Sequence, residues 1–303
     1  MNKKVFLFTT LLLSVLCNLL SAQDEVKISR IDCYNLGDGR YYCHDTESKK
    51  PLQGSVRIID GYTSQYTEAV FKDGIPNGTW KLFKNNALIQ ERTYKSGIID
   101  GAYKEYYADG SVKATRNYVD GKVEGKFVQY YADGKIESEI NFKNGMQEGD
   151  EISYDRDGKI RSTVSFEVGK ENGMKKELFK NSSSGDYEMI AYYKDGKKDG
   201  YYAETFMNGN LKEQGQYIDG KKDGTWEFGK RDGKRTRTEV YLNDEKIKET
   251  VYFTDGTVEV TREFKNGRKD GWERSYNYSD GKLVRETLYK EGSVVSSVTI
   301  LLD

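Results

Sequence analysis

The residues that could do chemistry are few in this sequence, and no known catalytic spacing joins them. His44 is the only histidine, so the chain cannot build a histidine-rich metal site or a repeated imidazole base. No Gly-x-Ser-x-Gly segment and no glycine-rich phosphate loop stands between a strand and a helix in the sequence. We therefore predict that the protein is not an enzyme and that it has no cofactor and no metal site.

One segment begins in the way that a calcium-binding loop begins. Asp155-Arg156-Asp157-Gly158 supplies the early carboxylates of such a loop, but Phe166 stands where the closing glutamate is required. The same four residues also fit a tight turn. Because the ligand set is incomplete, we interpret this segment as a turn.

Cys33 and Cys43 are the residues best placed for covalent chemistry. They lie symmetrically about Asp38 in a turn-rich segment, so a hairpin folded there would bring the two thiols opposite each other. In an oxidising compartment such a pair persists as a disulfide. The alternative is a pair of small, buried thiols, and we favour the disulfide.

A glycine recurs about every 24 residues through most of the sequence, and this period indicates the structural elements that position the residues above. We call these glycines the anchors. They are Gly54, Gly78, Gly101, Gly125, Gly149, Gly173, Gly200, Gly224 and Gly271. Self-similarity at a fixed period is typical of a repeat array, in which each unit is too small to bury a core alone.

The repeat that follows Gly125 shows which element the period encodes. Residues 135–142 alternate between two kinds of side chain, between Asp133-Gly134 and Asn144-Gly145. Both dipeptides favour the positive φ of tight hairpin turns, and period-two alternation between such turns is typical of half-buried strands. The side chains expected on the buried face are Ile136, Ser138, Ile140 and Phe142. We predict an all-β fold, an elongated antiparallel array of about ten 24-residue β-hairpins that forms a twisted, curled open sheet.

Aromatic residues recur at two positions of the repeat. One set lies late in the second strand: Tyr94, Tyr118, Phe142, Phe166, Tyr217, Phe264 and Tyr289. The other set lies two residues after an anchor glycine: Trp80, Tyr103, Phe127, Tyr202 and Trp226. We interpret these rings as the core. The alternative is a platform of exposed rings that binds sugars or peptides.

We divide the chain into three parts. Residues 1–22 have the pattern of a secretory signal peptide, because Lys3 and Lys4 precede an apolar run that closes with a small residue; a retained membrane anchor is the alternative. Residues 23–53 form an N-terminal cap, and residues 54–303 form the array. We expect the hairpin of residues 31–43 to cover the first exposed strand edge of the array.

The charge of the chain argues against a nucleic-acid ligand. With Lys3 and Lys4 removed, 46 basic residues stand against 49 acidic ones, a net charge of −3, and the two signs are interspersed. Residues 229–238 are rich in basic side chains and depart from the repeat pattern. They are a decayed repeat, which we favour, or a local binding site. Their candidate partner contacts are Lys230, Arg231, Lys234, Arg235 and Arg237.

The passage from Tyr217 to Trp226 resembles a MORN repeat, whose signature joins an aromatic residue, two glycines four residues apart and a second aromatic residue. Residues 71–80 show the same signature. Residues 101–110 resemble more closely the bacterial variant known as the YwqK-type antitoxin repeat. The resemblance covers residues 54–292 and implies the β-hairpin fold. Arrays of this kind serve mainly as scaffolds, whereas the antitoxin label implies that a toxin is neutralised in the cytoplasm.

From these observations we expect an exported, non-enzymatic repeat protein that acts as a protein-binding scaffold. Its expected location is the periplasm, the outer surface or the medium of a bacterium, with no membrane-spanning segment after signal removal. The alternative is an antitoxin or immunity protein that neutralises a toxin partner.

Overall fold

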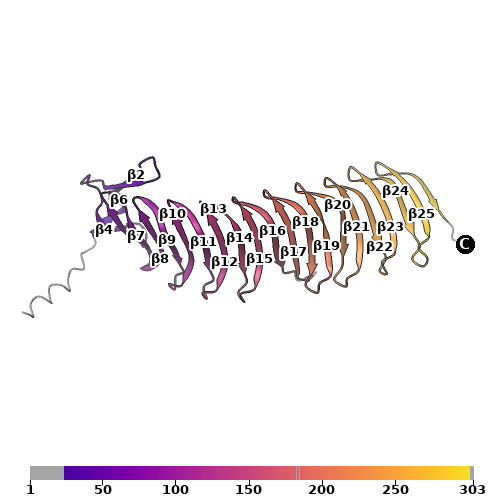
Figure 1. The fold of residues 1–303 in the computed structure, drawn as a ribbon, viewed down its shortest axis with the longest axis horizontal. Coiled ribbons are helices and arrows are strands. Elements are labelled where there is room, and N and C mark those ends of the chain that lie inside the picture. The colour runs from indigo at the N-terminus through magenta and orange to yellow at the C-terminus, as the bar shows by residue number, and fades with distance from the viewer. Residues whose placement is uncertain (1–23, 182, 184, 301–303) are drawn as a thin grey trace, which may run out of the picture. The chain divides into compact units, whose positions relative to one another are not determined.

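The computed structural model describes residues 24–181, 183 and 185–300, and these residues are mostly β-strand (Figure 1). The predicted signal peptide, residues 1–22, lies outside the described residues. The chain divides into two units, residues 1–136 with 143–145 and residues 137–142 with 146–303. We call them unit 1 and unit 2. The prediction of an all-β fold built from antiparallel hairpins in an open sheet is confirmed.

Unit 1 contains a short 3-10 helix, η1 (Ile28–Arg30), and eleven strands. The strands are β1 (Asp24–Lys27), β2 (Ile31–Asn35), β3 (Tyr41–Asp45), β4 (Gly54–Ile59), β5 (Gln65–Lys72), β6 (Ile75–Pro76), β7 (Gly78–Lys84), β8 (Ala87–Lys95), β9 (Ile98–Tyr106), β10 (Val112–Val119) and β11 (Lys122–Tyr130). From β4 onward, each strand pairs antiparallel with the next long strand along the chain.

Unit 2 contains the central residues of β12 (Ile136–Lys143) and the strands that follow it. These are β13 (Met146–Gln147), β14 (Gly149–Tyr154), β15 (Ile160–Glu167), β16 (Lys170–Phe179), β17 (Tyr187–Lys194), β18 (Lys197–Phe206), β19 (Leu211–Ile218), β20 (Lys221–Gly229), β21 (Arg235–Leu242), β22 (Glu245–Tyr252), β23 (Val258–Lys265), β24 (Arg268–Tyr276), β25 (Leu283–Lys290) and β26 (Ser293–Thr299). From β14 onward, consecutive strands pair antiparallel.

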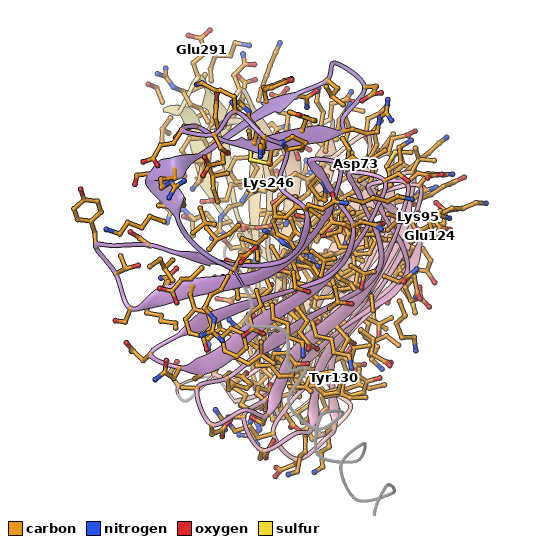
Figure 2. The ribbon with its side chains drawn as sticks, turned by 90° about the vertical axis from the view of Figure 1, so that its left-hand side faces the viewer. Asp73, Lys95, Glu124, Tyr130, Lys246 and Glu291 are labelled. Atoms are coloured by element: carbon orange, nitrogen blue, oxygen red, sulfur yellow. A yellow bond between two sulfur atoms is a disulfide. The ribbon has the colours of Figure 1, made fainter. Side chains whose placement is uncertain are left out.

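Turns of two residues join each hairpin to the next. Such a tight turn is possible because both of its residues adopt positive φ. Asp120 has φ 48° and Gly121 has φ 80°, values that glycine adopts freely and that aspartate tolerates. We call these the repeat-joining turns. In unit 1 these turns lie along one side of the sheet, which is formed by strand ends, and Figure 2 shows Asp73, Lys95 and Glu124 toward that side. Tyr130, at the other end of β11, lies toward the opposite strand ends.

Each repeat-joining turn is hydrogen-bonded to the repeat before it. The backbone N–H of Asp120 donates to Asp100 Oδ2 (3.1 Å), and that of Gly121 donates to the carbonyl of Ile99 (2.9 Å). The same two bonds recur in unit 2 at the turn Asp219-Gly220. Because each turn is hydrogen-bonded to the preceding repeat, successive hairpins keep the same register, and equivalent side chains lie on the same face of the sheet.

The two faces of the sheet in unit 2 carry different side chains. Tyr202 is directly opposite Gly215 in the next strand, and Tyr201 is directly opposite Gln216. Side chains that alternate along a strand point to opposite sides. We therefore call the side that carries Tyr202 the ring face, and the side that carries Tyr201 the opposite face.

The N-terminal part of unit 1 differs from the expected arrangement. Strand β1 pairs in parallel with β4, so the strand outside β4 is β1 and not the hairpin of residues 31–43. That hairpin, β2–β3, forms a separate two-stranded sheet. Cys43 is buried in a cluster with Leu52, Val56, Ala69 and Phe71. The hairpin therefore packs on residues of the first repeat rather than closing its edge.

Residues 229–238, which we interpret as a decayed repeat, keep the hairpin structure of the array. They form the end of β20, a turn and the start of β21, with regular antiparallel pairing across the hairpin and one register shift at Gly229. The long interval between Gly224 and Gly271 holds two hairpin repeats, because Lys248 in β22 stands where the period places an anchor glycine. The repeat is kept in structure although its glycine is lost.

Candidate functional site

The ring face of unit 2 carries a cluster of aromatic side chains centred on Trp226. The indole is completely buried (0 % exposed), and its ring centroid lies 5.1 Å from that of Tyr217 and 5.6 Å from that of Tyr202. Gly215 makes room for it, because a Cβ added there would lie 2.3 Å from the indole ring. Lys222 covers the ring, with Nζ 3.7 Å from the indole centroid, an arrangement in which a cation is attracted to the ring face.

Charged side chains alternate with the rings on this face. Glu204 and Glu213 are directly opposite each other on β18 and β19, and Lys212 Nζ lies 2.5 Å from Glu204. Burial raises the pKa of Glu213 and lowers the pKa of Lys198, because each charged form loses water. Burial also raises the pKa of Tyr217, to about 12.

The ring face is filled by its own side chains, so we interpret it as a core and not as a reaction site. The buried positions of Tyr202 and Trp226 agree with the interpretation of the recurrent rings as core. The exposed rings belong to other positions in the sequence. Tyr192 and Tyr201, on the opposite face, are 42 % and 48 % exposed.

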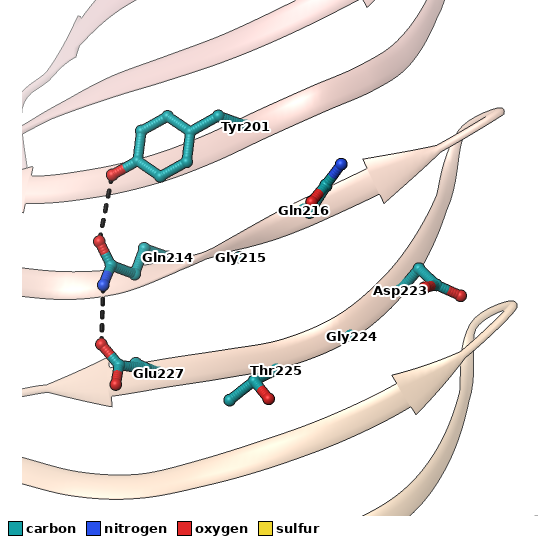
Figure 3. Close-up of a pocket in the computed structure, with 8 residues that line it drawn as sticks. All are labelled: Tyr201, Gln214, Gly215, Gln216, Asp223, Gly224, Thr225 and Glu227. Atoms are coloured by element: carbon teal, nitrogen blue, oxygen red, sulfur yellow. Dashed lines mark hydrogen bonds between the residues drawn. The ribbon is translucent and has the colours of Figure 1, made fainter.

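The opposite face of unit 2 contains an open groove across β18, β19 and β20 (Figure 3). Its volume is about 420 Å³. Tyr201 Oη donates to Gln214 Oε1 (3.1 Å), and Gln214 Nε2 donates to Glu227 Oε2 (2.7 Å). The remaining lining residues are Gly215, Gln216, Asp223, Gly224 and Thr225. This groove is lined by polar side chains that come from three neighbouring strands.

The same face exposes a row of apolar side chains beside the repeat-joining turns. Ile218 is 48 % exposed and Leu242 is 56 % exposed. Each is the last residue of its strand, β19 or β21, and each occupies the same position of its repeat, 24 residues apart. We call Ile218 and Leu242 the apolar row.

The five basic residues predicted as partner contacts do not share one surface. Lys230, Arg231 and Lys234 lie in the exposed turn between β20 and β21. Arg235 lies near Glu227 (3.6 Å) on the opposite face, whereas Arg237 lies over the Phe228 ring (3.7 Å) on the ring face. A partner contact stays a prediction for the three turn residues.

The predicted cysteine pair lies in the cap. Cys33 and Cys43 are directly opposite each other on β2 and β3 and are joined by a disulfide. His44 follows Cys43 on β3, and its ring centroid lies 6.3 Å from that of Tyr34 and 6.2 Å from that of Tyr42. Its Nδ1 is buried and has no hydrogen-bond partner among the described residues.

The anchor glycines meet a requirement of the backbone. All of those predicted have positive φ, from 69° at Gly224 to 112° at Gly271. The sequence carries a signal beside them that we did not use, an acidic residue before the anchor glycine. Asp100, Glu124, Glu148, Asp199, Asp223 and Asp270 each accept the N–H of the next repeat-joining turn.

Among the residues that the structure describes, no group of three or more His, Cys, Asp or Glu side chains could hold a metal ion. Within that same part of the chain, no helix has the length and apolar character needed to cross a membrane.

The repeated hairpin with its glycine turns and alternating faces is similar to one known family of repeats. Three consecutive segments match the MORN repeat variant. They are residues 99–120, 123–144 and 147–167, which correspond to three successive hairpins beginning in β9, β11 and β13. Among curated proteins, none matches this chain in sequence. MORN repeats are a non-catalytic type of repeat, and the match is consistent with a repeat protein involved in binding.

Proposed function

We propose that this chain is an exported, non-enzymatic scaffold that holds a protein partner in the cell envelope or outside the cell. The apolar row on the opposite face of unit 2 is the observation that carries the proposal. Ile218 and Leu242 are more than two-fifths exposed although they occupy strand positions. Apolar side chains that share an exposed face favour a protein interface.

The proposal also rests on the rigidity of that face. The turn after Ile218 is held by Asp199 Oδ2, and the turn after Leu242 is held by Asp223 Oδ2, each through a backbone N–H (3.1 and 3.2 Å). A surface that is fixed before binding loses little conformational entropy when the partner arrives. Export is supported by the signal-peptide pattern of residues 1–22 alone.

The experiment is a pull-down from envelope extract with the chain and with an Ile218→Lys, Leu242→Lys double variant. We expect the double variant to lose the partner, because two charges would be buried at the interface. The matched control is Val119→Lys in unit 1. Val119 is 46 % exposed and also ends its strand just before a repeat-joining turn, and its substitution should leave the partner bound.

Retention of the same partner by the double variant would overturn the role of the apolar row. Cell fractionation tests export separately. Recovery of the chain in the cytoplasm with residues 1–22 intact would overturn the exported scaffold and favour the antitoxin alternative.

A further inference from the structure

We propose that the groove at Tyr201 binds a neutral saccharide, a ligand class distinct from the protein partner proposed above. The groove lies on β18, β19 and β20 of unit 2 and holds about 420 Å³. Neighbouring strands lie about 4.8 Å apart, so three strands span about 10 Å, which is room for about one or two sugar rings.

The groove offers hydrogen-bonding groups that the fold does not use. Gln216 and Thr225 line it, both are exposed, and neither side chain has a hydrogen-bond partner among the described residues. An amide supplies two donors and an acceptor, and a hydroxyl supplies one donor and two acceptors. Sugar hydroxyls, which donate and accept at once, match this set.

The Tyr201 ring supplies the apolar part of the site. It is 48 % exposed, and its hydroxyl is fixed by donation to Gln214 Oε1 (Figure 3). Gln214 is in turn fixed by donation to Glu227. The ring is therefore held in place before a ligand arrives, and an aromatic surface next to placed polar groups is typical of small-ligand sites.

The floor of the groove carries no side chain at Gly224 or at Gly215. Gly224 has φ 69°, and apart from its two neighbours in the chain no residue has an atom within 4 Å of the place where a Cβ would be. A Cβ added at Gly215 would point toward Trp226 on the ring face, so this strand position presents backbone to the groove. A ring-shaped ligand can therefore approach the sheet between Tyr201 and Thr225.

The charges of the groove favour a neutral ligand. Asp223 Oδ2 accepts the backbone N–H of Asn243 (3.2 Å). Glu227 accepts Gln214 Nε2 through one oxygen, and Arg235 lies 3.6 Å from the other. Both carboxylates are thus engaged within the fold, which disfavours a cationic peptide. Two carboxylates and no basic side chain line the groove, which disfavours an anionic ligand.

The test is native electrophoresis of the full-length protein in gels that contain one soluble neutral polysaccharide each: an α-1,4-glucan, a β-1,3-glucan, a cellulose ether or an α-mannan. We expect at least one polymer to retard the protein. Tyr201→Ala should weaken the retardation about tenfold and Gln216→Leu about fivefold, because each removes one of the contacts to the sugar.

Three variants sharpen the test. Thr225→Val replaces an exposed hydroxyl with a methyl group of the same shape, so the variant should fold and bind the polymer more weakly. It therefore tests the groove even if Tyr201→Ala does not fold. Tyr62→Ala removes the most exposed tyrosine, 97 % exposed in unit 1, and should change nothing. The Ile218→Lys, Leu242→Lys variant should keep sugar binding while losing the protein partner, so the two proposals fail separately.

Two results would overturn the inference. One is the absence of retardation by all four polymers, or equal retardation of the parent and the Tyr201, Gln216 and Thr225 variants. The other is binding of a fluorescent Arg-rich decapeptide that is lost on Tyr201→Ala, which would make the groove a site for cationic peptides.

Discussion

Two hydrophobic clusters of buried residues, one in the described part of each unit, are built in different ways. In unit 1, Cys43 and Leu52 of the cap pack with Phe71 of the first long hairpin. In unit 2, all members of the buried cluster come from strands of the repeats: Met189, Ala191, Tyr202, Trp226 and Phe228. One cluster therefore has a separate segment over the sheet, and the other is covered by side chains of the sheet itself.

The tryptophans at equivalent repeat positions show what this difference means. Trp80 is half-buried and its Nε1 donates to the carbonyl of Val70 (3.0 Å). Trp226 is completely buried, and its Nε1 has no hydrogen-bond partner among the described residues. The lesson is that one layer of sheet can bury an indole when a glycine beside it opens the space and a lysine covers it, at the cost of a hydrogen bond.

The largest expected effect is that of truncating the two tryptophans. Trp226→Ala should lower the free energy of unfolding by about 3–5 kcal/mol, because it leaves a large cavity in the ring face. Trp80→Ala should cost about 1 kcal/mol less, because its ring is already partly in water. Urea unfolding followed by circular dichroism would measure both. A larger loss for Trp80→Ala would contradict the comparison.

The next effect concerns the cap of unit 1. A Cys33→Ser, Cys43→Ser variant should lose about 2–3 kcal/mol of cap stability, because the disulfide closes a loop with a sequence separation of 10 residues. The loss should appear as earlier hydrogen exchange in β2, β3 and β4. Exchange in the Trp226 cluster should not change, and a loss of protection there would mean that the two clusters fold as one.

Gly215 tests the space beneath Trp226. Gly215→Ala should destabilise the chain by about 1–3 kcal/mol, because the new Cβ would overlap the indole. Gly224→Ala is the control: it meets open space and carries only the strain of positive φ, about 1 kcal/mol. Thermal melts of the two variants would compare them. Equal losses would show that the indole moves away freely.

The smallest effect is a pH dependence that belongs to the ring face. Burial raises the folded-state pKa of Glu213 above its ordinary value, so folding favours its protonated form. The stability that it contributes is present below the unfolded-state pKa and is lost as the pH rises through the folded-state pKa. Glu213→Gln should therefore flatten the stability profile above about pH 4 and raise stability slightly at pH 7. An unchanged profile would contradict the burial of this carboxyl group.

Much of the fold could be predicted from the sequence because its turns are chemically explicit. Asp-Gly and Asn-Gly pairs mark the hairpins. On the face expected to be buried in residues 136–142, Ser138 is buried and Ile140 and Phe142 are half-buried, but Ile136 is exposed because it is the first residue of its strand. The strand pairing of Asp24–Lys27 could not be predicted, because a four-residue charged segment has no strong β-pattern. Its parallel partner β4 begins at Gly54, so the rest of the cap separates the two strands in the sequence.

The candidate site was harder to predict because it depends on local shifts in register. Arg235 and Arg237 are two residues apart and should share a face, but the register shift at Gly229 places them on opposite faces. Gly215 lies in mid-strand and not in a turn, so no turn pattern draws attention to it. Its reason is Trp226 on the ring face, which needs the space that a Cβ would fill.

Site-specific photo-crosslinking in living cells tests the central claim, that the opposite face of unit 2 is a binding surface. A photoreactive amino acid is placed at Leu242 in the apolar row, or at Val119, the equivalent position of unit 1. The account predicts one discrete protein adduct from Leu242 and none from Val119. An adduct from Val119 with none from Leu242 would contradict it.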